Sequence, residues 1–271
     1  MSRPEAPEPL PHPVVDNHCH LDMGLGGDVL PVQEALSASA AVGVPRIVQI
    51  GCDLPGARWA VETANRFDEI VAGVALHPNE APRVDLEPAF AEIEALAADP
   101  RVRAVGETGL DYFRTGEDGR AVQQESFRRH IDLAKRLGKT LVIHDRDSHE
   151  DVLRLVDEER APERVVMHCF SGDAAFAKAC LDRGFWLSFA GTVTFKNAQD
   201  LRDALVVAPQ DRVLVETDAP YLTPMPYRGR PNASYLIPLT MRVMAEARGE
   251  DLGELCAAVE ANTFAAFGGA W

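Results

Sequence analysis

Short apolar segments rich in β-branched residues alternate along the chain with amphipathic segments. The apolar segments span residues 13–18, 46–51, 70–76, 102–107, 140–144, 165–169, 185–190 and 212–217. This pattern predicts eight strands of a parallel sheet that is buried on both faces. Helical patterns separate the strands, as at 86–98 and 120–137, and a last one covers about 251–266. Ser148 and Asp173 precede two of these patterns and are predicted helix caps.

Eight strand–helix units in 271 residues predict a single α/β domain with the (β/α)₈ TIM-barrel fold. A doubly wound open sheet is the alternative fold. We expect residues 1–12, which are rich in proline, to be a mobile lead-in, and 13–271 to form the barrel domain. The lead-in has no apolar core of a signal peptide, and no apolar segment is long enough to span a membrane. The five cysteines form no Cys-x-x-Cys motif, so we expect free thiols and a cytoplasmic protein.

Most of the histidines and several carboxylates follow the predicted strands. Six of the eight histidines lie at or just after strand ends, namely His18, His20, His77, His144, His149 and His168. Glu107 ends the fourth predicted strand, and Asp218 follows the eighth. In a barrel, the carboxyl ends of the strands carry the chemistry, so these side chains are candidate site residues, except His149, which we expect to start a helix.

Imidazoles and carboxylates together are typical ligands of divalent metal ions and indicate metal-assisted hydrolysis. We expect His18, His20 and Asp218 to hold one ion and His144 and His168 to hold a second. Glu107 is the candidate bridging carboxylate. Asp218 is also the candidate base that takes a proton from the attacking water. Each residue has a structural alternative: a hydrogen-bonded core histidine, a helix cap for Glu107, or a turn for Asp218.

The loops after the strands also carry candidate substrate contacts. Arginine suits phosphate oxygens, and aromatic rings can stack on bases. The candidates are His77, Tyr112, Phe113, Arg114, Arg146, Lys196, Tyr221, Arg228 and Arg230. A solvated loop charge is the alternative for the basic residues, as is a salt bridge for Arg146. The net charge of −15 disfavours tight binding of duplex nucleic acid, so a nucleic-acid substrate would be held locally.

Several motifs in order resemble those of the TatD family of metal-dependent hydrolases. They are His18-Cys19-His20-Leu21-Asp22, Gly106-Glu107-Thr108-Gly109-Leu110-Asp111-Tyr112-Phe113, His144-Asp145-Arg146-Asp147, His168-Cys169-Phe170-Ser171-Gly172, Glu216-Thr217-Asp218-Ala219-Pro220, and a closing Asn262-Thr263 segment that ends in Phe267-Gly268. The resemblance implies an amidohydrolase-type (β/α)₈ barrel with a two-metal centre. It places the ligands at His18, His20, Glu107, His144, His168 and Asp218. The chain departs from the family pattern after Asn232, where Ala233-Ser234 replaces the usual Glu-Pro.

The resemblance further implies a cytosolic deoxyribonuclease, often a 3′-to-5′ exonuclease, with magnesium, manganese or zinc as the metal. DNA ends or single strands are therefore the expected substrate, for a protein expected to be a monomer, with an oligomer left open. The alternative is a metal-dependent ester or amide hydrolase, such as a D-aminoacyl-tRNA deacylase, because the same ions can polarise a carbonyl group. A third hypothesis is a non-catalytic metal-binding scaffold, for which the base Asp218 has no use.

Overall fold

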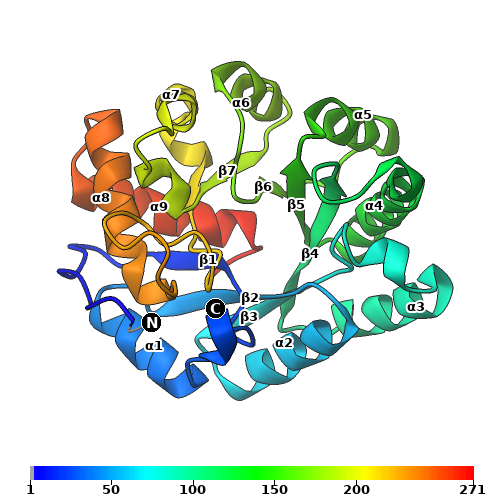
Figure 1. The fold of residues 1–271 in the computed structure, drawn as a ribbon, viewed down its shortest axis with the longest axis horizontal. Coiled ribbons are helices and arrows are strands. Elements are labelled where there is room, and N and C mark those ends of the chain that lie inside the picture. Colours follow the sequence, from blue (N-terminus) through cyan, green and yellow to red (C-terminus); the bar gives the residue numbers. More distant parts are fainter. Residues whose placement is uncertain (1–2) are drawn as a thin grey trace. The chain divides into compact units, whose positions relative to one another are not determined.

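The computed structural model describes residues 3–271; Met1 and Ser2, the start of the predicted lead-in, lie outside the described residues. Its strands form one eight-stranded sheet in the order β1 to β8. They are β1 (Val15–Cys19), β2 (Arg46–Gly51), β3 (Ile70–Val74), β4 (Val102–Asp111), β5 (Thr140–Arg146), β6 (Val165–Met167), β7 (Trp186–Phe189) and β8 (Val213–Val215). Helices alternate with the strands (Figure 1). This is the topology of the predicted (β/α)₈ barrel, which is confirmed.

Nine α-helices lie in the described part of the chain, none of which is both long and apolar enough to cross a membrane. They are α1 (Val32–Ala41), α2 (Leu54–Arg66), α3 (Leu86–Ala97), α4 (Glu117–Leu137), α5 (His149–Glu159), α6 (Ala174–Leu181), α7 (Gln199–Val207), α8 (Ile237–Arg248) and α9 (Leu252–Ala266). Asp173 caps α6 by accepting a hydrogen bond from the Phe176 amide. Ser148 precedes α5 but does not cap it, because its hydroxyl bonds to the Leu110 carbonyl and to Asp145 instead.

The chain divides into two compact units. The first contains the chain up to Gln49 and Gly172–Ala265. In it, β7 pairs with β8, and β1 pairs with β2, all in parallel. A bridge between Cys19 and Ala219 joins the end of β1 to the segment after β8. Two backbone hydrogen bonds hold the same junction, from Asp218 N to the His18 carbonyl at 2.9 Å and from His20 N to the Ala219 carbonyl at 2.8 Å.

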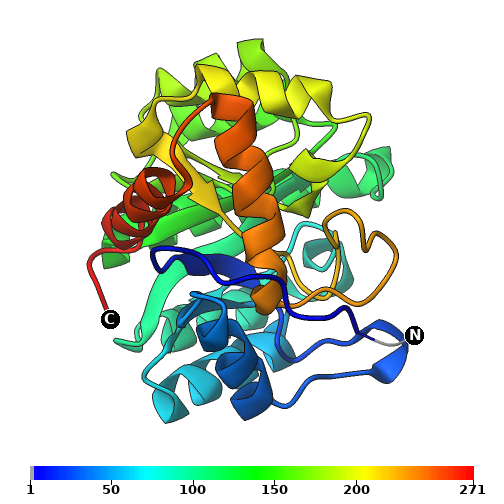
Figure 2. The same ribbon diagram turned by 90° about the vertical axis from the view of Figure 1, so that its left-hand side faces the viewer.

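The lead-in of this first unit runs across α8 (Figure 2). The Tyr235 hydroxyl donates a hydrogen bond to the Pro4 carbonyl, and the Arg242 guanidinium donates to the carbonyls of Glu8 and Pro9. These contacts tie residues 4–9 to the body of the unit. The mobility of the lead-in, and the behaviour of 13–271 as one domain, stay predictions.

The second unit contains Ile50–Ser171 and Ala266–Trp271. In it, β3, β4, β5 and β6 pair in parallel, and α4 packs against β4 and β5. The sequence places Glu107 at the end of the fourth strand, but β4 continues to Asp111, so that boundary is wrong. The strand continues because residues 108–111 pair with 143–146 of β5, after a shift in register between Val105 and Thr108. Glu107 therefore lies inside the sheet and not on a loop.

Candidate metal centre

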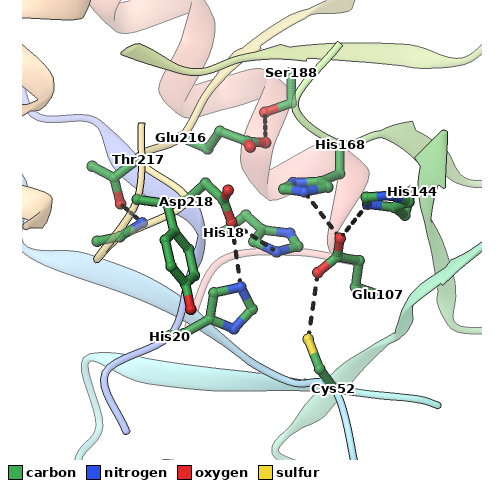
Figure 3. A network of polar contacts seen from close by, with 12 residues as sticks. His18, His20, Cys52, Glu107, His144, His168, Ser188, Glu216, Thr217 and Asp218 are labelled. Atoms are coloured by element: carbon green, nitrogen blue, oxygen red, sulfur yellow. Dashed lines mark hydrogen bonds and ion pairs between the residues drawn. The ribbon is translucent and has the colours of Figure 1, made fainter. Parts of the chain in front are cut away.

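In the first unit, two histidines and one aspartate form what we call the first ligand group: His18, His20 and Asp218. The His20 Nε2 atom lies 3.3 Å from Asp218 Oδ1, and the His18 Nε2 atom lies 3.9 Å from the same oxygen (Figure 3). The two imidazole rings are 5.2 Å apart between centroids, and both histidines are buried. The predicted pairing of the two histidines with Asp218 is thus present in the structure.

The junction between β1 and β8 positions this group. Asp16, which is fully buried, accepts hydrogen bonds from the Thr217 amide at 2.9 Å and the Thr217 hydroxyl at 2.6 Å. Burial raises the pKa of Asp16 to about 6, against the lowering effect of these hydrogen bonds. Asp218 itself adopts a left-handed backbone conformation with φ of 53°, which aspartate tolerates better than most residues. The hydrogen bonds between Asp16 and Thr217 hold together the two backbone segments that carry the candidate ligands His18 and Asp218.

In the second unit, Glu107, His144 and His168 form the second ligand group. The Oε1 atom of Glu107 lies 2.6 Å from His144 Nδ1 and 3.3 Å from His168 Nε2 (Figure 3). His77, predicted as a substrate contact, places its Nε2 atom 3.4 Å from the same oxygen. Three imidazoles thus converge on one buried carboxylate oxygen. The predicted grouping of Glu107 with His144 and His168 is also present.

Charge is concentrated on this second ligand group. Burial alone would raise the pKa of Glu107, but the charges of His168 and His77 and the hydrogen bonds from His144 and His168 hold it well below its usual value. Burial would likewise lower the pKa of His144, yet its hydrogen bonds to Asp111 and Glu107 raise it to about 9. Glu107 is therefore an anion at neutral pH, as a metal ligand must be.

Asp111 holds the other side of His144, a role that the sequence did not assign to it. Its Oδ2 atom lies 3.4 Å from His144 Nε2, and its Oδ1 atom accepts hydrogen bonds from the Phe113 and Arg114 amides. His144 pairs in register with Gly109, whose φ is 138°. A Cβ atom at Gly109 would lie 2.0 Å from the His144 carbonyl oxygen. Because glycine has no Cβ atom, the His144 backbone can approach β4 closely at position 109, which lies between Glu107 and Asp111 in the strand.

A sequence signal for Asp111 exists in the spacing of β4. Residues two apart on a strand point to the same face, so Glu107, Gly109 and Asp111 share one. The same reasoning could not find Cys52, whose thiol lies 3.4 Å from Glu107 Oε2, because it follows a different strand. Cys52 and Asp111 are thus contacts of the second ligand group to which the sequence assigned no role.

His77 has a defined hydrogen-bonding state. Its Nδ1 atom accepts a hydrogen bond from the Asn79 amide at 3.0 Å. A neutral imidazole has one acceptor nitrogen, so the proton of His77 lies on Nε2, which faces Glu107. In this tautomer His77 donates a hydrogen bond and does not ligate a metal through Nε2.

The donor sets of both ligand groups fit divalent metal ions. Each combines two imidazoles with a carboxylate, and zinc, manganese and magnesium-type ions accept such ligands. The carboxylate of Asp111 on the far nitrogen of His144 is the arrangement that orients metal-binding histidines in proteins. Within the second unit, His77, Glu107 and His144 bring one side-chain atom each within 4.8 Å of one another, and the tautomer of His77 leaves Glu107 and His144 as the candidate ligands of this set.

The predicted substrate contacts lie on loops and strand ends of each unit. In the second unit, the Arg146 guanidinium lies 3.9 Å above the Phe113 ring, and the Tyr112 hydroxyl donates to Asp151. In the first unit, Arg228 and Arg230 are exposed and lie over the rings of Phe195 and Tyr227. None of these four predicted residues contacts a ligand group through its side chain in the contacts just described, so their substrate roles stay predictions.

Comparison with known proteins gives a consistent result. A family model described as "TatD related DNase" matches residues 15–268. The "Uncharacterized metal-dependent hydrolase TatD" of Mycobacterium tuberculosis is 45% identical over 262 residues, covering 95% of this chain and 99% of that protein. The "Uncharacterized metal-dependent hydrolase YcfH" of Escherichia coli K12 is 40% identical over 256 residues, covering 93% of this chain and 94% of that protein.

Solved structures agree with the fold. The crystal structure of YJJV, a TatD homologue from Escherichia coli, superposes with a TM-score of 0.87 at 27% identity, covering 94% of this chain and 98% of that one. An organophosphorus hydrolase from Deinococcus radiodurans has a TM-score of 0.60 at 15% identity, with 94% and 92% covered, and shows the barrel fold alone. With its histidine and carboxylate ligand groups and these relatives, the chain belongs to the TatD-related DNase family of metal-dependent hydrolases.

Proposed function

We propose that the protein is a deoxyribonuclease that hydrolyses phosphodiester bonds at DNA ends, as a 3′-to-5′ exonuclease, with a centre of two divalent metal ions. The observation that carries the proposal is the pair of ligand groups, each with two imidazoles around one carboxylate oxygen. All six residues lie on, or directly after, strands of one parallel sheet, and barrel enzymes gather such residues at the carboxyl ends of the strands. We therefore propose that each of the two groups holds one divalent ion.

When bound, the metal ions would polarise the phosphoryl group and activate the attacking water. Asp218 is the proposed base: its side chain is partly exposed, and its Oδ1 atom faces both histidines of its group. Glu107 stays ionised at neutral pH and offers Oε2 in addition to the oxygen that faces the imidazoles. His77, with its proton on Nε2, is positioned to donate a hydrogen bond to a substrate oxygen.

The choice of a phosphate substrate is supported by the arginines that follow the strands. Arginines on the outer helices pair with carboxylates, as Arg128 does with Glu158 and Glu159. Among the residues that the structure describes, Arg146, Arg228 and Arg230 stack on aromatic rings and form no ion pair. In a chain with a net charge of −15, cations left without a carboxylate favour an anionic substrate.

A second candidate function, hydrolysis of an ester such as D-aminoacyl-tRNA, uses the same ions on a carbonyl group. It is separated from the first by one side-by-side assay. Purified protein with Mg²⁺ or Mn²⁺ should shorten end-labelled single-stranded DNA, and a chelator should stop the reaction. Asp218→Asn should lower the rate by at least about a hundredfold, which is the usual share of a general base.

The control variant for this assay is His149→Gln. His149 is also a histidine close to a strand end, but its Nδ1 atom pairs with Asp145 and it belongs to neither ligand group. We expect it to keep full activity and metal content. Cleavage of D-aminoacyl-tRNA but not of DNA would replace the first function by the second. DNA cleavage that survives Glu107→Ala would come from another protein or another site.

Metal content tests the centre without reference to activity. Elemental analysis should give two ions for each chain of the native protein and a lower number for a variant that lacks both His144 and His168. A single ion that this variant retains would contradict the two-metal centre. The cytoplasmic location and the monomeric state stay predictions.

A further inference from the structure

Phe113 places an aromatic ring in solvent directly beyond the second ligand group. Its side chain is 63% exposed, more than any other large hydrophobic side chain in the described part of the chain. It follows β4, and its amide donates a hydrogen bond to Asp111 Oδ1, the carboxylate that contacts His144. The ring is therefore accessible to a molecule bound next to this group.

The guanidinium of Arg146 lies over one face of this ring, with Cζ 3.9 Å from its centroid. In the described residues, the Arg146 side chain has no hydrogen bond or ion pair, although its neighbours Asp145 and Asp147 are acidic. The salt bridge considered as the alternative for Arg146 is therefore absent from the described residues. Arg146 and Phe113, which together we call the stacking platform, present a guanidinium over an aromatic ring, and the guanidinium N–H groups have no hydrogen-bond partner among the described residues.

The backbone fixes the stacking platform relative to the ligands. Gly109 pairs with His144 and Asp111 pairs with Arg146 in the β4–β5 register, and the Tyr112 amide donates to the Arg146 carbonyl at 2.9 Å. Arg146 is two residues beyond His144, which is about 7 Å along a strand. Because a strand alternates faces, Arg146 and His144 point to the same side of β5. A nucleotide whose phosphate lies at His144 has its base within reach of the platform.

We propose that the stacking platform binds an unpaired nucleobase of the DNA strand and so directs the enzyme to single-stranded ends. The inference rests on the proposed deoxyribonuclease function and adds a specificity-determining site to it. Aromatic rings and arginine planes bind bases of any sequence by stacking, since every base has a π face. Bases inside a duplex are covered by their neighbours, and only an unpaired base can lie on the ring. Tyr112 is less suited to this role, because it is only partly exposed and its hydroxyl donates a hydrogen bond to Asp151.

A double-mutant cycle between protein and DNA tests the proposal. The native protein and Phe113→Ala are compared on short single strands in which an abasic nucleotide replaces each of the three terminal bases in turn. We expect Phe113→Ala to raise KM about tenfold on the intact strand, which equals about 1.4 kcal/mol, with kcat little changed. On the strand whose abasic site removes the stacked base, the same substitution should have no effect. Phe113→Trp should retain native KM.

The matched control is Phe67→Ala, because Phe67 also carries an arginine near its ring, Arg66 at 5.7 Å, but lies between α2 and β3, before the strand begins. It should leave KM unchanged. Equal KM for Phe113→Ala and native protein, or the same increase on intact and abasic strands, would overturn the platform while leaving the nuclease function intact.

A binding measurement separates the two proposals if no cleavage is seen. A single strand carrying 2-aminopurine at the stacked position is titrated with protein in the presence of a chelator. Stacking should quench the fluorescence in the native protein and in Phe113→Trp but not in Phe113→Ala. Quenching without cleavage supports the platform and contradicts the nuclease function, whereas cleavage without Phe113-dependent quenching contradicts the platform alone.

Discussion

Replacing Asp111 by asparagine tests how the second ligand group is held. Asp111 is 1% exposed and accepts three hydrogen bonds, two from backbone amides and one from Asn79 at 2.8 Å, and its Oδ2 atom also lies 3.4 Å from His144 Nε2. An asparagine has a single acceptor oxygen. If that oxygen keeps the two backbone bonds, the new amide group faces Asn79 and the His144 Nε2–H, which are both donors. His144 then loses the partner that orients its ring.

The size of the effect follows from this loss. Partners that orient a metal-binding imidazole are worth about tenfold to a hundredfold in metal affinity, or about 1.4–2.7 kcal/mol. We expect the upper part of this range, because the facing donors leave His144 without a substitute acceptor. The same unsatisfied donors should lower the free energy of unfolding by about 1–3 kcal/mol. The protein should nevertheless stay folded, since the residue lies at the end of β4 and outside the apolar core.

The assay is a calorimetric titration of metal-free protein with Mn²⁺ or Zn²⁺ at a temperature where both proteins are folded. The matched control is Asp145→Asn, which breaks an aspartate–histidine pair of the same kind, with His149; Asp145 follows His144 on β5. The control should keep native affinity. Native affinity in Asp111→Asn, or an equal loss in both variants, would show that Asp111 does not position a metal ligand.

Two further predictions concern stability. His130 is fully buried and its pKa is lowered to about 3, by burial and against a hydrogen bond to Ser126. Its stabilising contribution is complete above the unfolded-state value of about 6.5 and is lost as pH falls towards 3, by about 1.4 kcal/mol for each pH unit. Urea unfolding should therefore show a free energy of unfolding about 2 kcal/mol lower at pH 5 than at pH 7, and His130→Gln should not show this decrease. The same decrease in that variant would refute the assignment of the pH dependence to His130. Gly109→Ala should lower the free energy of unfolding by about 1–3 kcal/mol from its backbone conformation alone, and by more because of the contact with the His144 carbonyl. It should also weaken metal binding. Urea unfolding and metal titration measure the two effects, and native values in both would contradict the close approach.

The sequence predicted the fold and the candidate ligand residues because both depend on local patterns. Eight apolar segments alternating with helical ones leave few topologies, and each strand was found within a few residues of its observed bounds. The His18-x-His20 spacing predicts two side chains on one face of a strand, and the structure places both against Asp218. The composition added little to these predictions, because the net charge of −15 disfavours binding of duplex nucleic acid but does not identify a substrate.

The tertiary structure decided what depends on register and burial. The extension of β4 beyond Glu107 could not be predicted, because it is stabilised by pairing with β5 and not by the apolar content of 108–111. The tautomer of His77 depends on a turn at Asn79, and the role of Asp111 depends on where β5 lies beside it. The exposure of Phe113 and the unpaired charge of Arg146 follow from the same register. A linear sequence gives the residue types that can bind a metal, whereas their protonation, orientation and partners are set by neighbours distant in the chain.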